Sequence, residues 1–211
     1  MTDFNVAFDM DDVLVPFYEY MALRFMNKYK GTNLVWEDLT DYKLSVVCDI
    51  AREEGSQIVL DFYKSNEFLS MPPIEGSIES VENIEADKKT IITSRPELIK
   101  RFTDHFILGN YTDIDHPIIY SDHWTDQASI NKNKGEICNE LEIQLMFEDR
   151  IKHALDCARK EVLVIMPEYP WNSQRQLLKR ERNPEVLERI HRVQGLWPEM
   201  EQKYNDIREK L

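Results

Sequence analysis

Three carboxylates fall within four residues near the start of the chain, in the segment FDMDD of residues 8–12. Like charges this close repel one another, and such crowding is tolerated where a cation is bound or a pKa is tuned. In an extended or tightly turning backbone, Asp9 and Asp11 face one side while Met10 turns to the other. One carboxylate could then attack a phosphoryl group and bind a metal ion, and the second could serve as general acid and base.

The alternative interpretation of this cluster is an acidic turn or helix N-cap after a strand, where Asp is common. Other polar groups along the chain favour the chemical interpretation. Thr93 and Ser94 directly follow an apolar run, which places a hydroxyl and neighbouring backbone N–H groups to hold phosphate oxygens. Lys134 opens a helical pattern and could stabilise the charge of the nucleophile and the transferred phosphoryl group, although Lys132 competes for this role.

Glu148 and Asp149 follow another apolar run and supply two more carboxylates. They suit Mg2+, a hard ion that takes one or two protein carboxylates and several waters. Each feature alone has an ordinary explanation, such as a helix cap or an exposed lysine. Because the acid, hydroxyl and amine groups recur at the ends of successive elements, we predict a single site at which they meet.

Short apolar runs precede most of these groups and predict buried strands. The runs are Phe4–Phe8, Thr90–Ile92, Leu145–Phe147 and Val162–Met166, and a further short run follows at Ile190–Val193 without a structural prediction. Helical patterns occupy residues 96–106, 134–141, 151–159 and 198–211. Strands that alternate with helices predict an α/β fold with a Rossmann-like parallel sheet that carries helices on both faces. The active groups would converge at the carboxyl edge of this sheet.

Residues 15–75 are rich in aromatic residues and helix formers, which predicts a small helical cap domain inserted after the first strand. The turn-rich residues 71–76 mark the return to the core. We therefore expect a core domain of residues 1–14 and 76–211 and a cap domain of residues 15–75. The cap aromatics either line the substrate pocket or pack the cap itself. The candidates are Trp36, Tyr42, Phe62 and Phe68.

The chain carries 26 Lys and Arg against 39 Asp and Glu, a net charge of −13. Such a surface repels polyanions, which argues against polymeric nucleic acid as a partner. A small phosphorylated substrate is compatible, because a bound metal ion and a few cations can reverse the field inside one pocket. Without a long apolar run or signal-peptide features, we expect a cytoplasmic monomer or homodimer with no membrane partner. The five histidines show no metal-ligand spacing, and we interpret most of them as surface or structural residues.

In their order and types, these residues resemble the haloacid-dehalogenase-like (HAD-like) hydrolase superfamily. Residues 9–13 look like its first motif, Thr93 its second, Lys134 its third, and Glu148 with Asp149 its fourth. Three stretches narrow the resemblance to the 5'(3')-deoxyribonucleotidase family, the small type C 5'-nucleotidases. They are residues 8–17 (FDMDDVLVPF), 71–80 (MPPIEGSIES) and 169–172 (YPWN).

That resemblance implies a HAD-like fold and a Mg2+-dependent phosphomonoesterase that acts on nucleoside monophosphates through an aspartyl-phosphate intermediate. Asp9 would be the nucleophile and a metal ligand, and Asp11 would be the general acid and base whose carbonyl also binds the metal. The resemblance further implies Asp149 for Mg2+, Thr93, Ser94 and Lys134 for phosphate, and Phe17 against the base or sugar of the substrate. We also predict Glu148 as a metal ligand and Arg95 and Tyr42 as substrate-binding residues.

Two positions depart from the family pattern. Asp12 stands where Gly is common and adds negative charge beside the site, and Glu148 stands where Asp is more usual. The second change is compatible with function if Asp149 is the direct metal ligand. Two other functions stay open: a HAD-like phosphatase of a sugar phosphate or other small metabolite, and a catalytically impaired phosphate-binding regulatory protein.

Overall fold

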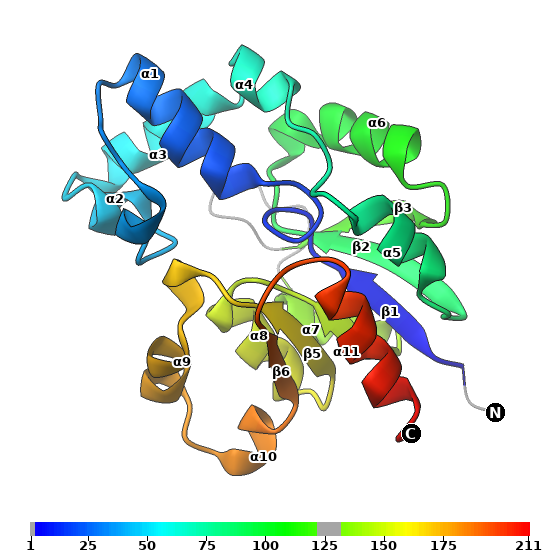
Figure 1. Ribbon diagram of the computed structural model, residues 1–211. Helices are drawn as coiled ribbons and strands as arrows, with labels where there is room; N and C mark the ends of the chain where they lie inside the picture. The colour runs from blue at the N-terminus through cyan, green and yellow to red at the C-terminus, as the bar shows by residue number, and fades with distance from the viewer. Residues whose placement is uncertain (1–2, 122–131) are drawn as a thin grey trace.

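The computed structural model describes residues 3–121 and 132–211 of the chain. Its centre is a six-stranded parallel sheet with the order β3-β2-β1-β4-β5-β6 (Figure 1). The strands are β1 (Asn5–Phe8), β2 (Lys88–Thr93), β3 (Asp115–Tyr120), β4 (Ile143–Phe147), β5 (Leu163–Pro167) and β6 (Ile190–Val193). The predicted α/β fold with a Rossmann-like parallel sheet is confirmed.

Alternate residues of the strands enter two separate cores, as the two-residue repeat of a strand requires. Phe8 and Phe147 point into one core, and Ala7 and Met146 point into the other. Because both faces of the sheet are buried, its central strands consist of nearly continuous apolar runs.

Helices cover both faces of the sheet (Figure 1). The core of Phe8 is covered by α5 (Ser77–Asn83), α6 (Lys100–Asn110) and α11 (Glu199–Arg208). The core of Ala7 is covered by α7 (Lys134–Glu140), α8 (Ile151–Ala158), α9 (Gln174–Arg180) and α10 (Pro184–Leu187). Two 3-10 turns, η3 (Glu97–Ile99) and η4 (Pro170–Asn172), precede α6 and α9. The helical patterns predicted from residues 96, 134, 151 and 198 correspond to η3 with α6, α7, α8 and α11.

A group of short helices lies between β1 and α5 in the chain, beyond the carboxyl end of β1 (Figure 1). These inserted helices are η1 (Glu19–Met26), α1 (Asn27–Tyr29), η2 (Trp36–Asp38), α2 (Leu44–Val47), α3 (Arg52–Phe62) and α4 (Asn66–Leu69). Phe62 packs at their centre, with ring centroids 5.4 Å from Phe17 and 5.6 Å from Phe68. Phe62 and Phe68 therefore pack the inserted helices together rather than line a pocket.

Strand β3 is absent from the sequence-based prediction. Its segment DHPIIY begins with Asp and contains Pro117, which lacks a backbone N–H and is tolerated mainly in edge strands. β3 does lie at the edge of the sheet, and its pairing with β2 shifts register between Thr90 and Ile92.

In the described ranges, no helix has the length and apolar composition needed to cross a membrane.

Candidate active site

The first strand delivers Asp9 to the carboxyl edge of the sheet. Its backbone N–H donates to the carbonyl of Phe147 (2.9 Å), so sheet pairing continues one residue beyond β1. A tight loop follows, in which the N–H of Val15 donates to the carbonyl of Met10 (3.0 Å). Asp12 has a φ of 60°, a left-handed conformation that Asp adopts more readily than most residues other than Gly. The HAD-like pattern commonly has Gly at this position. Asp can replace it because Asp also adopts the left-handed conformation.

Three aromatic side chains anchor this loop. The hydroxyl of Tyr169 donates to the carbonyl of residue 12 at 2.9 Å, and the indole N–H of Trp197 donates to that of residue 13 at 2.9 Å. The hydroxyl of Tyr111 donates to the carbonyl of residue 14 at 3.2 Å. The carboxylate of Asp12 is itself engaged, since it accepts a hydrogen bond from the N–H of Tyr18 at 2.9 Å. The loop that carries Asp9 and Asp11 is thus held in place before any ligand binds.

The ammonium group of Lys134 lies between two buried carboxylates. Its Nζ is 2.7 Å from Oδ1 of Asp9 and 2.6 Å from Oε2 of Glu148, and none of the three side chains is more than 6% exposed. Burial raises the pKa of Asp9 to about 7, an effect that Glu148 increases and Lys134 opposes. Burial acts to raise the pKa of Glu148, but the combined effect of Lys134 and His153 outweighs burial and lowers that pKa. The three groups form one charge-assisted network.

The start of α7 places Lys134. Asn133 and Glu136 form a capping box, in which each side chain accepts a hydrogen bond from the other residue's N–H, at 3.0 and 2.9 Å. Gly135 lets α7 approach α8 closely, because a Cβ there would lie 2.0 Å from the carbonyl oxygen of Asp156. The first turn of α7 therefore backs onto α8 and carries Lys134 to Asp9.

Lys132, the competing cation, lies outside this network. Its Nζ pairs with the carboxylate of Glu140 at 2.6 Å, and both side chains are about half exposed. The structure therefore brings Lys134, and not Lys132, next to the predicted nucleophile.

Asp11 is held by a buried arginine. Nε and Nη2 of Arg95 donate to Oδ1 of Asp11 at 2.9 and 2.6 Å, and Nη1 donates to Oγ1 of Thr103 at 3.3 Å. The Arg95 side chain is fully buried, and its guanidinium lies 5.5 Å from the ring centroid of Phe68. Arg95, predicted to bind substrate, therefore lies behind Asp11 rather than on an open pocket wall.

Thr93 and Ser94 follow β2, as predicted. Thr93 is buried, and its Oγ1 accepts a hydrogen bond from the N–H of Arg95 at 3.3 Å. The Ser94 hydroxyl is 2.8 Å from that of Ser121, the residue that follows β3. Of the three predicted phosphate-binding residues, Thr93, Ser94 and Lys134, Ser94 lines the pocket described below.

Asp149 is fully buried beside the same network. Its Oδ2 accepts a hydrogen bond from Nε1 of Trp171 at 2.8 Å, and its backbone carbonyl accepts one from Nδ2 of Asn172 at 2.7 Å. Its Oδ1 is buried and has no hydrogen-bond partner among the described residues. Burial, followed by the nearby charge of Glu148, raises the pKa of Asp149 well above its usual value. A buried carboxylate oxygen without a donor is the environment that a bound cation would satisfy.

A second arrangement of possible metal ligands involves His153. Donor atoms of Asp9, Glu148 and His153 lie within 4.8 Å of one another. Lys134 already supplies a positive charge to both of these carboxylates, so a divalent cation among them would face the Lys134 ammonium group. Burial lowers the pKa of His153 to about 4, which keeps its imidazole neutral near pH 7. Asp149, unlike the carboxylates of Asp9 and Glu148, has no cation partner among the described residues.

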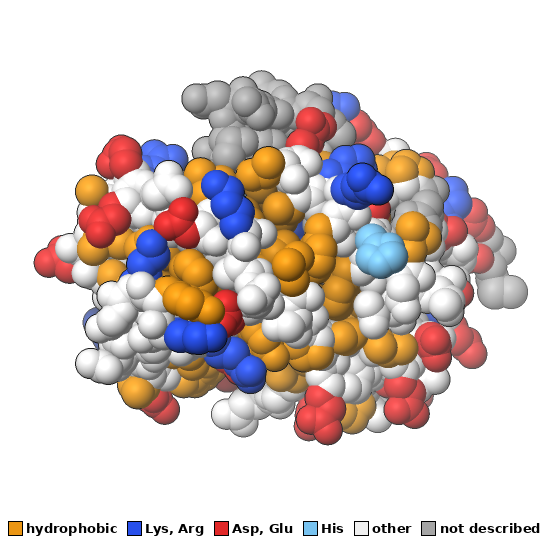
Figure 2. All heavy atoms as spheres, turned by 90° about the horizontal axis from the view of Figure 1, so that it is seen from above, with side chains coloured by type: hydrophobic (Ala, Val, Ile, Leu, Met, Phe, Trp, Pro, Cys, Tyr) orange, Lys and Arg blue, Asp and Glu red, His pale blue; other side chains and the backbone are white. Residues whose placement is uncertain are grey.

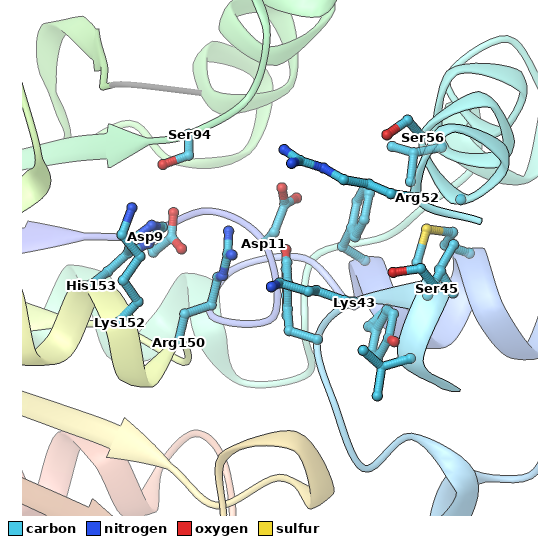
Figure 3. A pocket seen from close by; sticks show the side chains of 18 of the residues that line it. Asp9, Asp11, Lys43, Ser45, Arg52, Ser56, Ser94, Arg150, Lys152 and His153 are labelled. Atoms are coloured by element: carbon cyan, nitrogen blue, oxygen red, sulfur yellow. The ribbon is translucent and has the colours of Figure 1, made fainter. Parts of the chain in front are cut away.

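A pocket of about 640 Å³ opens between the carboxyl edge of the sheet and the inserted helices (Figure 3). This volume lies within the usual range for small-molecule sites. Asp9, Asp11 and Ser94 line it from the sheet side, and Phe17 and Tyr42 line it as the sequence predicts. Its other aromatic residues are Tyr18 and Tyr63, and its cations are Lys43, Arg52, Arg150 and Lys152.

Several pocket residues were missed by the sequence analysis. Arg150 follows the predicted acidic pair directly, and its guanidinium lies 3.9 Å from the ring centroid of Tyr42. That adjacency was the only sequence signal for it. His153 is buried beside Glu148 rather than on the surface, and no ligand spacing marks it. Lys43 and Arg52 sit in segments whose position over the pocket depends on the fold of the inserted helices.

The fold is similar to that of solved hydrolase structures. A haloacid dehalogenase-like family hydrolase from Streptococcus pneumoniae has a TM-score of 0.61 and 13% identity, over 90% of this chain and 93% of that chain. A protein described as a predicted phosphatase from Clostridium acetobutylicum has a TM-score of 0.64 and 15% identity, over 99% and 100% of the two chains. A HAD family hydrolase from Deinococcus radiodurans R1, with bound phosphate and sodium, has a TM-score of 0.59 and 12% identity, over 100% and 96%. At these identities the likeness concerns the fold, and it confirms the predicted HAD-like architecture.

Among curated proteins, no significant match to the chain was found. One family model does match, that of the "5' nucleotidase, deoxy (Pyrimidine), cytosolic type C protein". The match covers residues 3–194, which include the loop after β1 and all the other predicted site residues. The chain therefore belongs to this family of type C 5' nucleotidases, which confirms the resemblance predicted from its motifs.

Proposed function

We propose that the chain is a Mg2+-dependent phosphomonoesterase that dephosphorylates nucleoside monophosphates through an aspartyl-phosphate formed on Asp9. The observation that carries the proposal is the position of Asp9, which lines the pocket while its carboxylate is ion-paired to the buried Lys134. Asp11 lines the same pocket, with its carboxylate held by Arg95. A nucleophile and a proton donor therefore face one cavity.

In the first step, a carboxylate oxygen of Asp9 attacks the phosphorus and the ester P–O bond breaks. Asp11 gives its proton to the departing alcohol oxygen. Both bonds from Arg95 go to Oδ1 of Asp11, which leaves Oδ2 for proton transfer. Lys134 balances the negative charge that Asp9 shares with the transferred group. In the second step, Asp11 takes a proton from water, the water oxygen attacks the same phosphorus, and inorganic phosphate leaves with Asp9 restored.

For the metal, we propose Asp9, Asp149 and the backbone carbonyl of Asp11 as the protein ligands of Mg2+. The unpartnered Oδ1 of Asp149 supports this choice. Glu148, whose two oxygens accept from Lys134 and from the N–H of Arg150, would act as the partner of Lys134 rather than as a direct ligand. When bound, Mg2+ supplies positive charge that neutralises the phosphate oxygens and the buried carboxylates.

The aromatic part of the pocket supports a nucleoside as the rest of the substrate. Phe17, Tyr42 and Tyr63 offer apolar ring surface beside Asp11, and bases stack well on such rings. We propose that residues 15–75 form a cap domain that supplies this surface. We also propose that the protein works in the cytoplasm, in keeping with the cytosolic type of its family.

The test of this function is phosphate release from a panel of nucleoside monophosphates and sugar phosphates, with and without Mg2+. We expect hydrolysis of nucleoside monophosphates in the presence of Mg2+ and little activity after chelation. A preference for sugar phosphates would assign a different substrate class. Binding of Mg2+ and nucleotide with no turnover of any monoester would overturn the proposed activity.

The pKa of Asp9 predicts how Mg2+ stabilisation depends on pH. Without metal, folded Asp9 holds its proton up to about pH 7, whereas in the unfolded chain the carboxyl ionises near its ordinary value of 3.8. Folded Asp9 therefore binds more protons over this window, and its contribution to stability should fall as pH rises through it, whereas His153, whose folded pKa is about 4, contributes in the opposite direction. Glu148 has a lowered pKa and titrates below the window. Mg2+ binds ionised carboxylates, so the stabilisation it provides should grow with pH.

Thermal unfolding at about pH 5 and about pH 8 measures this effect. The increase in Tm caused by Mg2+ should be clearly larger at the higher pH. The variant Asp149→Asn should lose most of that increase. An increase that does not depend on pH, or one that Asp149→Asn leaves intact, would contradict the assigned ligands.

A further inference from the structure

The pocket gathers cations although the chain as a whole is acidic. Lys43, Arg52, Arg150 and Lys152 line it, in a protein with a net charge of −13. Figure 2, which views the molecule from the side of α1 and α6, shows Lys and Arg side chains interspersed among hydrophobic ones across this face, with Asp and Glu side chains both at its margins and between them. The pocket lining therefore holds four cations against the two carboxylates of Asp9 and Asp11, the reverse of the balance in the whole chain.

Two of these cations lie at the end of the pocket away from Asp9. Figure 3 shows Asp9 and His153 at one end, Asp11 near the middle, and Arg52 and Lys43 reaching in from the other end. Arg52 is the first residue of α3, and Lys43 immediately precedes α2. Both therefore belong to the inserted helices, on the wall that faces the sheet edge.

Neither distant cation has a counter-charge among the residues that the structure describes. Within the described ranges, no carboxylate lies within 4.0 Å of the Lys43 ammonium or the Arg52 guanidinium. The half-buried side chains of Ser45 and Ser56 line the same end of the pocket and add two hydroxyl groups. Exposed cations are usually just solvated. Here both point into a pocket beside two hydroxyls, which is a donor set suited to a phosphate.

The proposed reaction leaves this end of the pocket unused. One phosphate, bound by Asp9, Ser94 and Lys134, completes the chemistry, and a nucleoside monophosphate carries no second charge for Lys43 and Arg52. From this mismatch, and resting on the proposed function, we infer that the preferred substrate is a nucleoside bisphosphate. One phosphate is hydrolysed at Asp9, and the second, on the opposite side of the sugar, binds Lys43 and Arg52. Figure 3 shows Ser94 on the side of Asp9 and Ser45 and Ser56 at the opposite end of the pocket, which favours two separated phosphates over a diphosphate.

The test compares phosphate release from a nucleoside 3',5'-bisphosphate and from the 5'-monophosphate of the same nucleoside, with Mg2+ present. We expect kcat/KM to be at least about tenfold higher for the bisphosphate, the ratio that corresponds to about 1.4 kcal/mol. The double variant Lys43→Ala/Arg52→Ala should lower this preference about tenfold. The matched control is Arg175→Ala/Lys179→Ala, which removes the same two residue types from the exposed surface of α9 and should keep the preference.

Two results would overturn the inference while leaving the proposed function in place. One is an equal kcat/KM for the bisphosphate and the monophosphate. The other is a kcat/KM for the nucleoside 5'-diphosphate that is higher than that for the bisphosphate. A preference for the bisphosphate that decreases as salt is added would support the inference. Lys43 and Arg52 are exposed, so salt screens their attraction for a phosphate. If no monoester is hydrolysed, the proposed function fails. In that case, calorimetry measures the affinity of the protein for the same two nucleotides. The inference requires that the bisphosphate bind more tightly than the monophosphate, and that this difference in affinity be lost in Lys43→Ala/Arg52→Ala.

Discussion

Replacing Asp9 by Asn should abolish phosphate release, with a loss of kcat on the order of 10⁴-fold or more, as for other enzymes that lose their nucleophile. The amide keeps the volume of the side chain and an oxygen that can accept from Lys134, so the site should hold its shape. It lacks the anionic oxygen that attacks phosphorus. Steady-state phosphate release, with protein that shows an unchanged unfolding transition, measures the effect.

Asp12→Asn is the matched control for this variant. It makes the same chemical change three residues away, Asn tolerates the left-handed conformation of residue 12, and its oxygen can still accept from the N–H of Tyr18. We expect its activity to stay within about threefold of the unaltered protein, as for a residue outside the reacting groups. An active Asp9→Asn protein, or equal losses in both variants, would refute the assigned nucleophile.

Replacing Lys134 by Met should damage both stability and activity. The substitution keeps much of the side-chain volume but leaves the carboxylates of Asp9 and Glu148 buried without their shared cation. Removal of one partner from a buried ion pair costs about 3–5 kcal/mol. Loss of a cation at the reacting phosphate should lower kcat about 10²–10³-fold. Urea unfolding and phosphate release measure the two effects.

Two further variants separate these effects. Lys132→Met removes an exposed pair with Glu140 and should change stability by about 1 kcal/mol or less. Lys134→Met/Glu148→Gln removes the unpaired charge of Glu148, so it should recover part of the lost stability but little of the activity. If Lys134→Met were as stable and active as Lys132→Met, the buried network would have no role in either property.

Much of the site was predictable because parallel strands end at a common edge of the sheet. Asp9, Thr93 and Glu148 each follow an apolar run, and the pairing of β1 with β2 and β4 brings these strand ends together. Lys134 was predictable for a related reason, since α7 precedes β4 and its first turn returns to that edge. The order of the strands was not predicted and comes from the structure.

The rest depends on side-chain contacts that sequence patterns do not encode. Glu148 and Asp149 are neighbours of the same chemical type, yet Glu148 pairs with Lys134. Asp149 accepts from Trp171 through Oδ2, and its Oδ1 has no partner in the described part of the chain. The charge of Arg95 led to the prediction that it binds substrate in an open pocket. In the structure its side chain is buried and paired with Asp11. Lys43 and Arg52 reach the pocket only through the packing of the inserted helices, and exposed charges leave no periodic signal.

The most direct test is to trap the covalent intermediate. Protein mixed with excess nucleotide and Mg2+ is quenched in acid during turnover, and its peptides are analysed by mass spectrometry. We expect one added phosphoryl group on the peptide that contains Asp9, and none in Asp9→Asn. Rapid turnover with no phosphoryl group on Asp9, or with the group on another residue, would contradict the mechanism.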